Sequence, residues 1–159
     1  MVIVDTSVLI HFSRVNKLNL LKSYFGKITI TAEVSQEMHA GITGLSEFAK
    51  ADWIKIERTN VLQAKELSKL EGIEIADASL LLLAKNMNDV LLTNDAYLVI
   101  VAKSKVVECL WPTTFVLTCL KKKVITKSEA KQIIYELVHS GMHLKNDVYS
   151  AILDSIDKM

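Results

Sequence analysis

Short apolar runs rich in β-branched residues recur along the chain, and polar turn residues separate them. Val, Ile and Thr fit the pleated surface of a sheet better than most other residues. On this pattern we predict five strands, at residues 2–4, 28–31, 53–57, 90–93 and 106–109. Runs this short are typical of strands rather than of helices.

Between the predicted strands, apolar residues recur at the three-to-four-residue spacing of amphipathic helices. The helices predicted in this way cover residues 16–25, 46–52, 60–70, 76–87 and 95–104. The segment 76–87 is apolar on nearly every side, so we expect it to lie deep against the sheet. Alternation of strand and helix is typical of a parallel sheet covered on both faces. The sequence therefore predicts an α/β fold, a three-layer α/β/α sandwich with a mostly parallel central sheet.

The end of the chain is different, because only helical patterns follow Trp111 and Pro112. The predicted helices there cover residues 113–123, 127–141 and 146–157. Glycine, proline and serine do not cluster into a linker between two folding units. We therefore expect an α/β domain over residues 1–110, with residues 111–159 forming a helical extension that packs on this domain or on a partner.

Composition limits the function less than the pattern does. The 159 residues include 19 basic and 18 acidic ones, for a net charge of +1, which gives no basic footprint for nucleic acid over the whole surface. The run at residues 121–123 is three lysines, which at a helix end more often complement the helix dipole than mark a binding site. The two cysteines, Cys109 and Cys119, form no CxxC motif and favour a reduced, cytoplasmic protein. No apolar run approaches the about 20 residues of a membrane helix, so we expect a soluble chain without a membrane partner.

Four carboxylates stand where predicted strands give way to helices. Asp5 follows the first strand, and Asp95 comes two residues after the fourth. Asp77 begins the most apolar helix, and Glu37 lies early in the segment after the second strand. Because ligands of parallel sheets bind outside the carboxyl ends of the strands, we expect these acids to converge on one edge.

Taken singly, each acid also has an ordinary structural role. Asp77 and Asp95 stand where helix caps and first-turn acids belong, and an Asp cap contributes about 1 kcal/mol. Asp5 fits a turn into the next helix, and Glu37 fits an exposed helical position. A purely structural role therefore remains an alternative for each residue.

The set of four favours a metal site over capping. Gathered carboxylates repel one another, and burial strengthens the repulsion. The nearest cationic side chains in sequence, such as Lys85 and Lys103, lie well down their helices. A hard divalent cation such as Mg²⁺ accepts a few carboxylates and keeps several waters, which suits a site that also holds a phosphate. No group of His and Cys residues has the spacing of a zinc site.

Four stretches, VIVDTSVLI, ITAEVSQEM, IADASLLLLAK and VLLTNDAYLVIVAK, together resemble the PIN domain, a metal-dependent ribonuclease fold found in VapC-like toxins of prokaryotic toxin–antitoxin pairs. The resemblance covers roughly residues 1–110 and rests on the order and spacing of the acidic motifs. It implies Mg²⁺ or Mn²⁺ held by Asp5, Glu37, Asp77 and Asp95. The tail looks like the helical extension of a largely archaeal branch of this family.

The resemblance also suggests supporting residues. Thr6 or Ser7, and Thr93, are polar neighbours that steady the acids. Asn94 either orients a water or a phosphate or simply makes the turn. Glu33 lies four residues before Glu37 and can occupy the same helix face, so either is the second acid.

The expected activity is hydrolysis of RNA phosphodiester bonds by a metal-dependent endoribonuclease. By resemblance, we expect a homodimer, and a toxin role would add a small antitoxin-like partner. The alternative is a catalytically silent PIN fold that binds RNA or serves as a scaffold. A haloacid-dehalogenase-like phosphatase is disfavoured, because it needs a second Asp where Ser7 stands.

Overall fold

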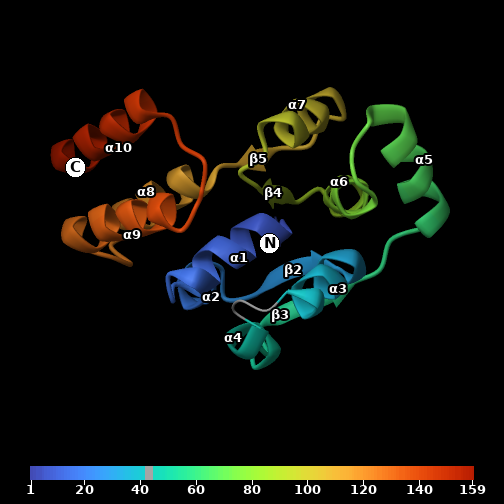
Figure 1. Cartoon of the computed structure of the whole chain (residues 1–159), viewed down its shortest axis with the longest axis horizontal. Coiled ribbons are helices and arrows are strands. Elements are labelled where there is room, and N and C mark those ends of the chain that lie inside the picture. The colour runs from blue at the N-terminus through green and yellow to red at the C-terminus, as the bar shows by residue number, and fades with distance from the viewer. Residues whose placement is uncertain (42–44) are drawn as a thin grey trace.

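The strands of the computed structural model form one parallel sheet, and the structure describes residues 1–41 and 45–159. The strands are β1 (Val2–Val4), β2 (Ile28–Thr31), β3 (Ile54–Glu57), β4 (Val90–Leu92) and β5 (Cys109–Leu110). Their order is β3-β2-β1-β4-β5, with parallel pairing throughout. Figure 1 shows β3, β2, β4 and β5 one above another from bottom to top. The chain order reverses between β1 and β4, which makes their carboxyl ends the topological switch point of the sheet.

Helices connect the strands and then continue beyond β5 as a tail. The connecting helices are α1 (Thr6–Arg14), α2 (Leu18–Phe25), α3 (Ala32–Ala40), α4 (Leu45–Ala49), α5 (Val61–Glu71), α6 (Ile75–Met87) and α7 (Ala96–Ser104). The tail consists of α8 (Pro112–Lys121), α9 (Lys127–His139) and α10 (Asn146–Lys158). The predicted α/β fold with a parallel sheet and C-terminal helices is confirmed.

Helix α6 is the central cover of the sheet. It packs against β1, β2 and β4, and most of its residues from Ala76 to Ala84 are buried. The expectation that this apolar helix lies deep in the molecule is therefore confirmed. Its position brings its first turn to the carboxyl ends of the strands that it covers.

The strand predicted at residues 106–109 is wrong in position. Strand β5 contains only Cys109–Leu110, while Val106 lies two residues beyond the end of α7, has a φ of 60° and is 93% exposed. The amide of Val107 donates to the carbonyl of Ala102, which closes the helix end in the manner of a Schellman motif. Two adjacent valines resemble a strand, but the first of them occupies a helix-end position that usually carries glycine.

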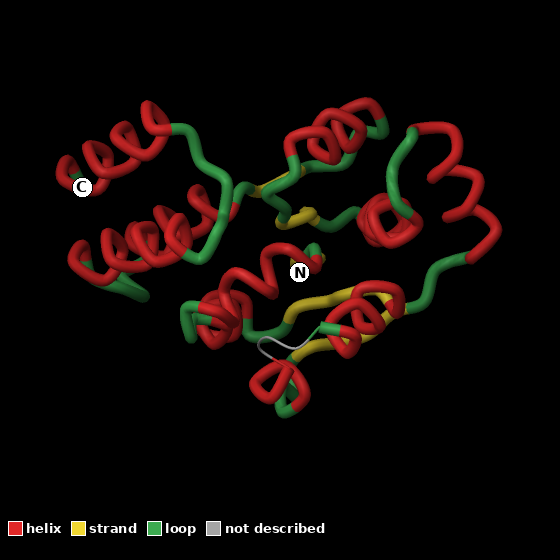
Figure 2. Tube along the Cα trace, in the orientation of Figure 1, coloured by secondary structure: helices red, strands yellow, loops and turns green. Residues whose placement is uncertain are grey.

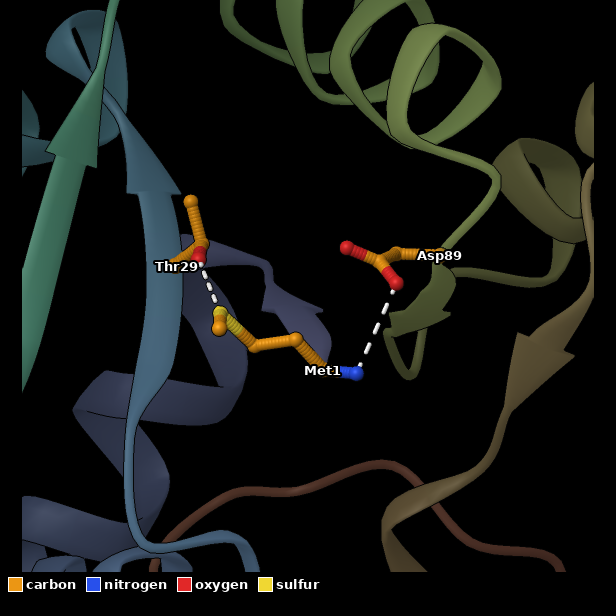
Figure 3. Close-up of polar contacts among 3 residues, drawn as sticks. All are labelled: Met1, Thr29 and Asp89. Carbon is orange, nitrogen blue, oxygen red and sulfur yellow. Dashed lines mark hydrogen bonds and ion pairs between the residues drawn. The ribbon is translucent and has the colours of Figure 1, made fainter.

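The N-terminus is tied to the amino edge of the sheet, opposite the switch point. The Met1 amino group lies 3.5 Å from Asp89 Oδ1, just before β4, and Thr29 Oγ1 in β2 lies 3.2 Å from Met1 Sδ (Figure 3). These contacts hold Met1 between β2 and the start of β4.

The helical tail packs against the helices that follow β1, and Figure 2 shows it as a group of helices at one end of the sheet. Phe115 of α8 is fully buried, and its ring lies 5.3 to 5.9 Å from the rings of Phe12, Tyr24 and Phe25. Helix α9 packs on α8, and α10 packs on α9. Among the described helices, none is long and apolar enough to cross a membrane.

Candidate functional site

The predicted site lies at the carboxyl ends of the two central strands. Asp5 directly follows β1, and Asp95 comes three residues after the end of β4. The Asp5 amide donates to the carbonyl of Leu92 at 3.1 Å, which continues the β1–β4 pairing up to the acid. Ligands of open α/β sheets bind where the strand order reverses, and these two acids stand at that point.

Asp5 is a buried carboxylate held by two hydroxyls. Its side chain is 6% exposed, and its Oδ2 accepts hydrogen bonds from Thr93 Oγ1 at 2.8 Å and Ser7 Oγ at 3.2 Å. Burial raises the pKa of Asp5 above its usual range, while these hydrogen bonds work in the opposite direction. Asp5 stands at the N-cap position of α1 but makes no side-chain capping bond. Its polar contacts therefore orient the carboxylate rather than cap the helix.

Asp95 is exposed and does cap a helix. Its Oδ1 accepts from the amide of Leu98 at 3.0 Å, at the start of α7. Its own amide donates to Thr93 Oγ1 at 3.1 Å. Thr93 is thus bonded to Asp5 through its hydrogen and to Asp95 through its oxygen, so one buried hydroxyl fixes both acids. Capping and a ligand role are compatible, since a carboxylate has two oxygens.

The pKa of Asp77 reflects the negative charge gathered at the site. It lies half-buried in the first turn of α6. Burial, and then the charges of Asp5, Asp95, Glu74 and Glu37, raise its pKa to about 7. Acids from separate segments therefore act on one carboxyl group, as expected if they converge. The ion pairs found among the described residues involve other carboxylates.

Glu37 lies on α3 beside α1. Its carboxylate is exposed and accepts a hydrogen bond from Thr6 Oγ1 at 2.5 Å. Glu33, one turn earlier, has a buried Oε2 without a hydrogen-bond partner among the described residues. Glu33 is not among the charges that raise the pKa of Asp77, whereas Glu37 is. This difference favours Glu37 as the second acid, and the choice stays a prediction.

Two neighbouring residues depart from the expected picture. The Asn94 side-chain amide donates to the carbonyl of His143 at 3.2 Å, in the loop between α9 and α10, so it points to the tail. Glu74, at the N-cap position of α6, adds a fifth negative charge that the sequence reasoning missed. The available signal was its position three residues before Asp77, in the turn that leads into the predicted helix.

The four candidate carboxylates are suitable ligands for a hard cation, although their side chains do not point to one common centre. Within residues 1–41 and 45–159, no group of three or more His, Cys, Asp or Glu side chains is close enough to hold a metal ion. The Asp95 carboxylate accepts a hydrogen bond from the Leu98 amide, and the Glu37 carboxylate accepts one from Thr6. All the candidate ligands are carboxylate oxygens, which Mg²⁺ and Mn²⁺ prefer. A divalent cation would also relieve the repulsion that raises the pKa of Asp77.

Fold and site together define a doubly wound α/β protein with an acidic switch point. The family model DUF3368, described as a PIN domain, matches residues 1–158. The chain belongs to the PIN-domain family. PIN domains are generally nucleases and typically use divalent metals. No curated protein matches the chain.

Proposed function

We propose that this chain is a metal-dependent endoribonuclease that hydrolyses RNA phosphodiester bonds with Mg²⁺ or Mn²⁺ held by Asp5, Glu37, Asp77 and Asp95. One observation carries the proposal: Asp5 and Asp95, both bonded to Thr93, stand at the switch point of a PIN-family sheet. The raised pKa of Asp77, to which the charges of Asp5, Asp95 and Glu37 contribute, supports it. The concentration of negative charge around the buried Asp5 and the half-buried Asp77 does not stabilise the fold by itself. It becomes useful when a cation and a phosphodiester are bound.

Each acid has a defined place in this proposal. Asp5 is the central ligand, because Thr93 and Ser7 fix its orientation. Asp77 and Asp95 contribute oxygens from the starts of α6 and α7, directly or through water. Glu37, steadied by Thr6, binds the cation or takes a proton from the attacking water. The bound metal supplies charge neutralisation at the phosphodiester and a more acidic water.

We extend the proposal to the biological setting that the VapC-like motifs suggest. The chain then acts in the cytoplasm as a homodimeric toxin, and a small antitoxin-like protein silences its site. Residues 1–110 form the nuclease unit in this proposal, and residues 111–159 form its helical extension.

A catalytically silent RNA-binding or scaffold module is the second candidate. The observation that favours it is the orientation of the acids, which are not gathered around a single point. The two candidates differ in metal response, since a silent module has no need for a cation at the switch point.

The test compares two Asp→Asn variants that remove the same charge. Asp5→Asn changes the candidate ligand, and Asp89→Asn changes a carboxylate at the opposite edge of the sheet. Each protein is incubated with end-labelled single-stranded RNA in Mg²⁺, Mn²⁺ or chelator, and its melting temperature is measured in the same buffers.

We expect the wild type and Asp89→Asn to cleave RNA only when metal is present. At a metal concentration about 100 times Kd, binding adds about 2.7 kcal/mol to stability. For a chain of this size that raises Tm by roughly 5–10 °C. Asp5→Asn should show neither cleavage nor the rise in Tm. RNA binding without cleavage or a metal-induced rise in the wild type would instead identify a silent module.

A further inference from the structure

A cavity of about 500 Å³ lies between the start of α7, the start of α8 and the loop that leads into α10. Its walls are mainly apolar, with Trp111, Leu117, Val148 and Ile152 among them. Among the described residues that line it, Lys145 is the only formally charged one, and none carries a carboxylate. Pockets for small ligands have volumes of about 300–1,000 Å³ and similar apolar walls, so the cavity is large enough for a nucleoside-sized group.

The cavity adjoins the candidate metal site through the sheet. Trp111 follows β5 as Asp95 follows β4, and the Thr93 amide donates to the carbonyl of Leu110 at 3.1 Å. Both therefore stand at the same carboxyl edge, one strand apart. Asn94 and Ala96, on either side of Asp95 in the chain, both line the cavity. A chain of nucleotides crossing the acids would meet this cavity next.

The chemistry of the lining suits a base better than a phosphate or a metal. A phosphate gains little from apolar walls, and a metal finds no carboxylate there. Trp111 is 36% exposed, so part of its indole surface is accessible for stacking. Stacking of a base on an aromatic ring requires no particular sequence, because every base has a π-face. Lys145 adds a positive charge for the phosphate attached to that base.

We propose that this cavity, the Trp111 pocket, holds one unstacked nucleobase of the RNA while the adjoining phosphodiester lies at the acids. The proposal rests on the proposed function for the identity of the ligand. It assigns Trp111 a role in binding substrate, and it gives the helical extension a part in the site, since residues 111–159 supply most of the pocket lining. The Asn94 bond to His143 holds the loop that closes one side.

Tryptophan fluorescence tests the pocket without any need for cleavage. The chain has two tryptophans, so a Trp53→Phe background leaves Trp111 as the sole emitter. In a buffer that contains a metal chelator, so that no RNA is cleaved, this protein is titrated with a short single-stranded RNA and with an abasic oligomer of the same length. We expect the RNA to quench the emission and the abasic oligomer to leave it unchanged. Equal effects of the two oligomers would overturn the proposal, because the phosphates alone would then explain binding.

Affinity measurements with variants give an independent readout. Trp111→Leu should weaken RNA binding about 5- to 100-fold, which corresponds to the ~1–3 kcal/mol of stacking on one base. Val148→Phe, which leaves Trp111 in place and fills the cavity from α10, should weaken it as well. Tyr135→Leu removes an exposed aromatic ring on α9 outside the pocket and should have no effect.

The outcomes separate this proposal from the nuclease proposal. Base-dependent quenching in a protein that never cleaves RNA would support the pocket and refute catalysis. Metal-dependent cleavage with unchanged RNA affinity in Trp111→Leu and Val148→Phe would refute the pocket alone. Quenching by an apolar peptide but not by RNA would also overturn it, since the cavity would then be a protein-docking site.

Discussion

Replacing Thr93 by valine tests whether one hydroxyl holds the two central acids in place. Thr93 is fully buried, donates to Asp5 Oδ2 at 2.8 Å and accepts from the Asp95 amide at 3.1 Å. Valine has nearly the same shape and fills the same space, but it makes neither bond. The substitution therefore removes two hydrogen bonds while leaving the packing almost unchanged.

The size of the effect follows from the two bonds. A hydrogen bond to a charged group contributes about 1.5–3 kcal/mol, and one between neutral groups about 0.5–1.5 kcal/mol. Thr93→Val should therefore lower the free energy of unfolding by roughly 2–4 kcal/mol. For a chain of this length the matching fall in Tm is roughly 5–15 °C. Thr93→Ser keeps the hydroxyl and loses one methyl group, so it should cost only about 1 kcal/mol.

Urea denaturation and thermal melting of the three proteins, each with and without Mn²⁺, measure these differences. Asp5 and Asp95 lose a shared anchor in Thr93→Val, so its Mn²⁺ affinity should also fall about 10- to 100-fold, as when partners of metal ligands are removed. Thr93→Ser should bind Mn²⁺ like the wild type. If Thr93→Val is as stable as Thr93→Ser, the hydroxyl does not hold the acids and the reasoning fails.

Three further predictions concern the rest of the fold. Val106→Gly should raise Tm by roughly 2–8 °C, because an exposed valine at φ 60° bears a left-handed strain of about 1–2 kcal/mol. A lower Tm would show that the strain is absent. Burial, and then the charge of Arg14, lower the pKa of His11 in the folded protein. The contribution of neutral His11 to stability is therefore complete above its unfolded-state pKa near 6.5, and it is lost as the pH falls through its lower folded-state pKa. Between about pH 7.5 and about pH 5, the Tm of the wild type should therefore fall more steeply than that of His11→Gln, and parallel curves would contradict this. Phe115→Ala should cost about 3–5 kcal/mol and leave one unfolding transition in urea, whereas two transitions would mean that the tail unfolds separately.

The strand pattern is the part of the fold that the sequence predicts best. The runs at residues 2–4 and 28–31 form strands with those bounds, because buried parallel strands consist almost entirely of β-branched and apolar residues. The pattern failed at Val106, where the backbone requires a left-handed conformation that valine disfavours. Local preference predicted a strand there, and the tertiary fold imposed a helix end.

The sequence indicates where two acids of the candidate site lie, but not how their side chains are held. Strand ends and sheet topology indicate where Asp5 and Asp95 lie, because the carboxyl ends of parallel strands share an edge. The bridge through Thr93 and the charge of Glu74 depend on side-chain directions that spacing does not give. The same holds for Asn94, whose amide meets the tail, since contacts between residues so far apart in sequence require the folded chain.

The distribution of buried polar groups supports a binding role for the acidic edge. Asp5, Thr31 and Thr93 are buried at or just beyond the carboxyl ends of β1, β2 and β4, and each makes side-chain hydrogen bonds. Thr31 bonds to Ser79 of α6 at 2.9 Å, and this contact fixes the turn that carries Asp77. Hydroxyls would satisfy these strand ends without any charge, so apart from the cap that Asp95 provides to α7, the carboxylates add repulsion that does not stabilise the fold. Binding of a cation would offset this repulsion between carboxylates. The central three strands of the sheet place the acids at one edge, where a single cation could act on them.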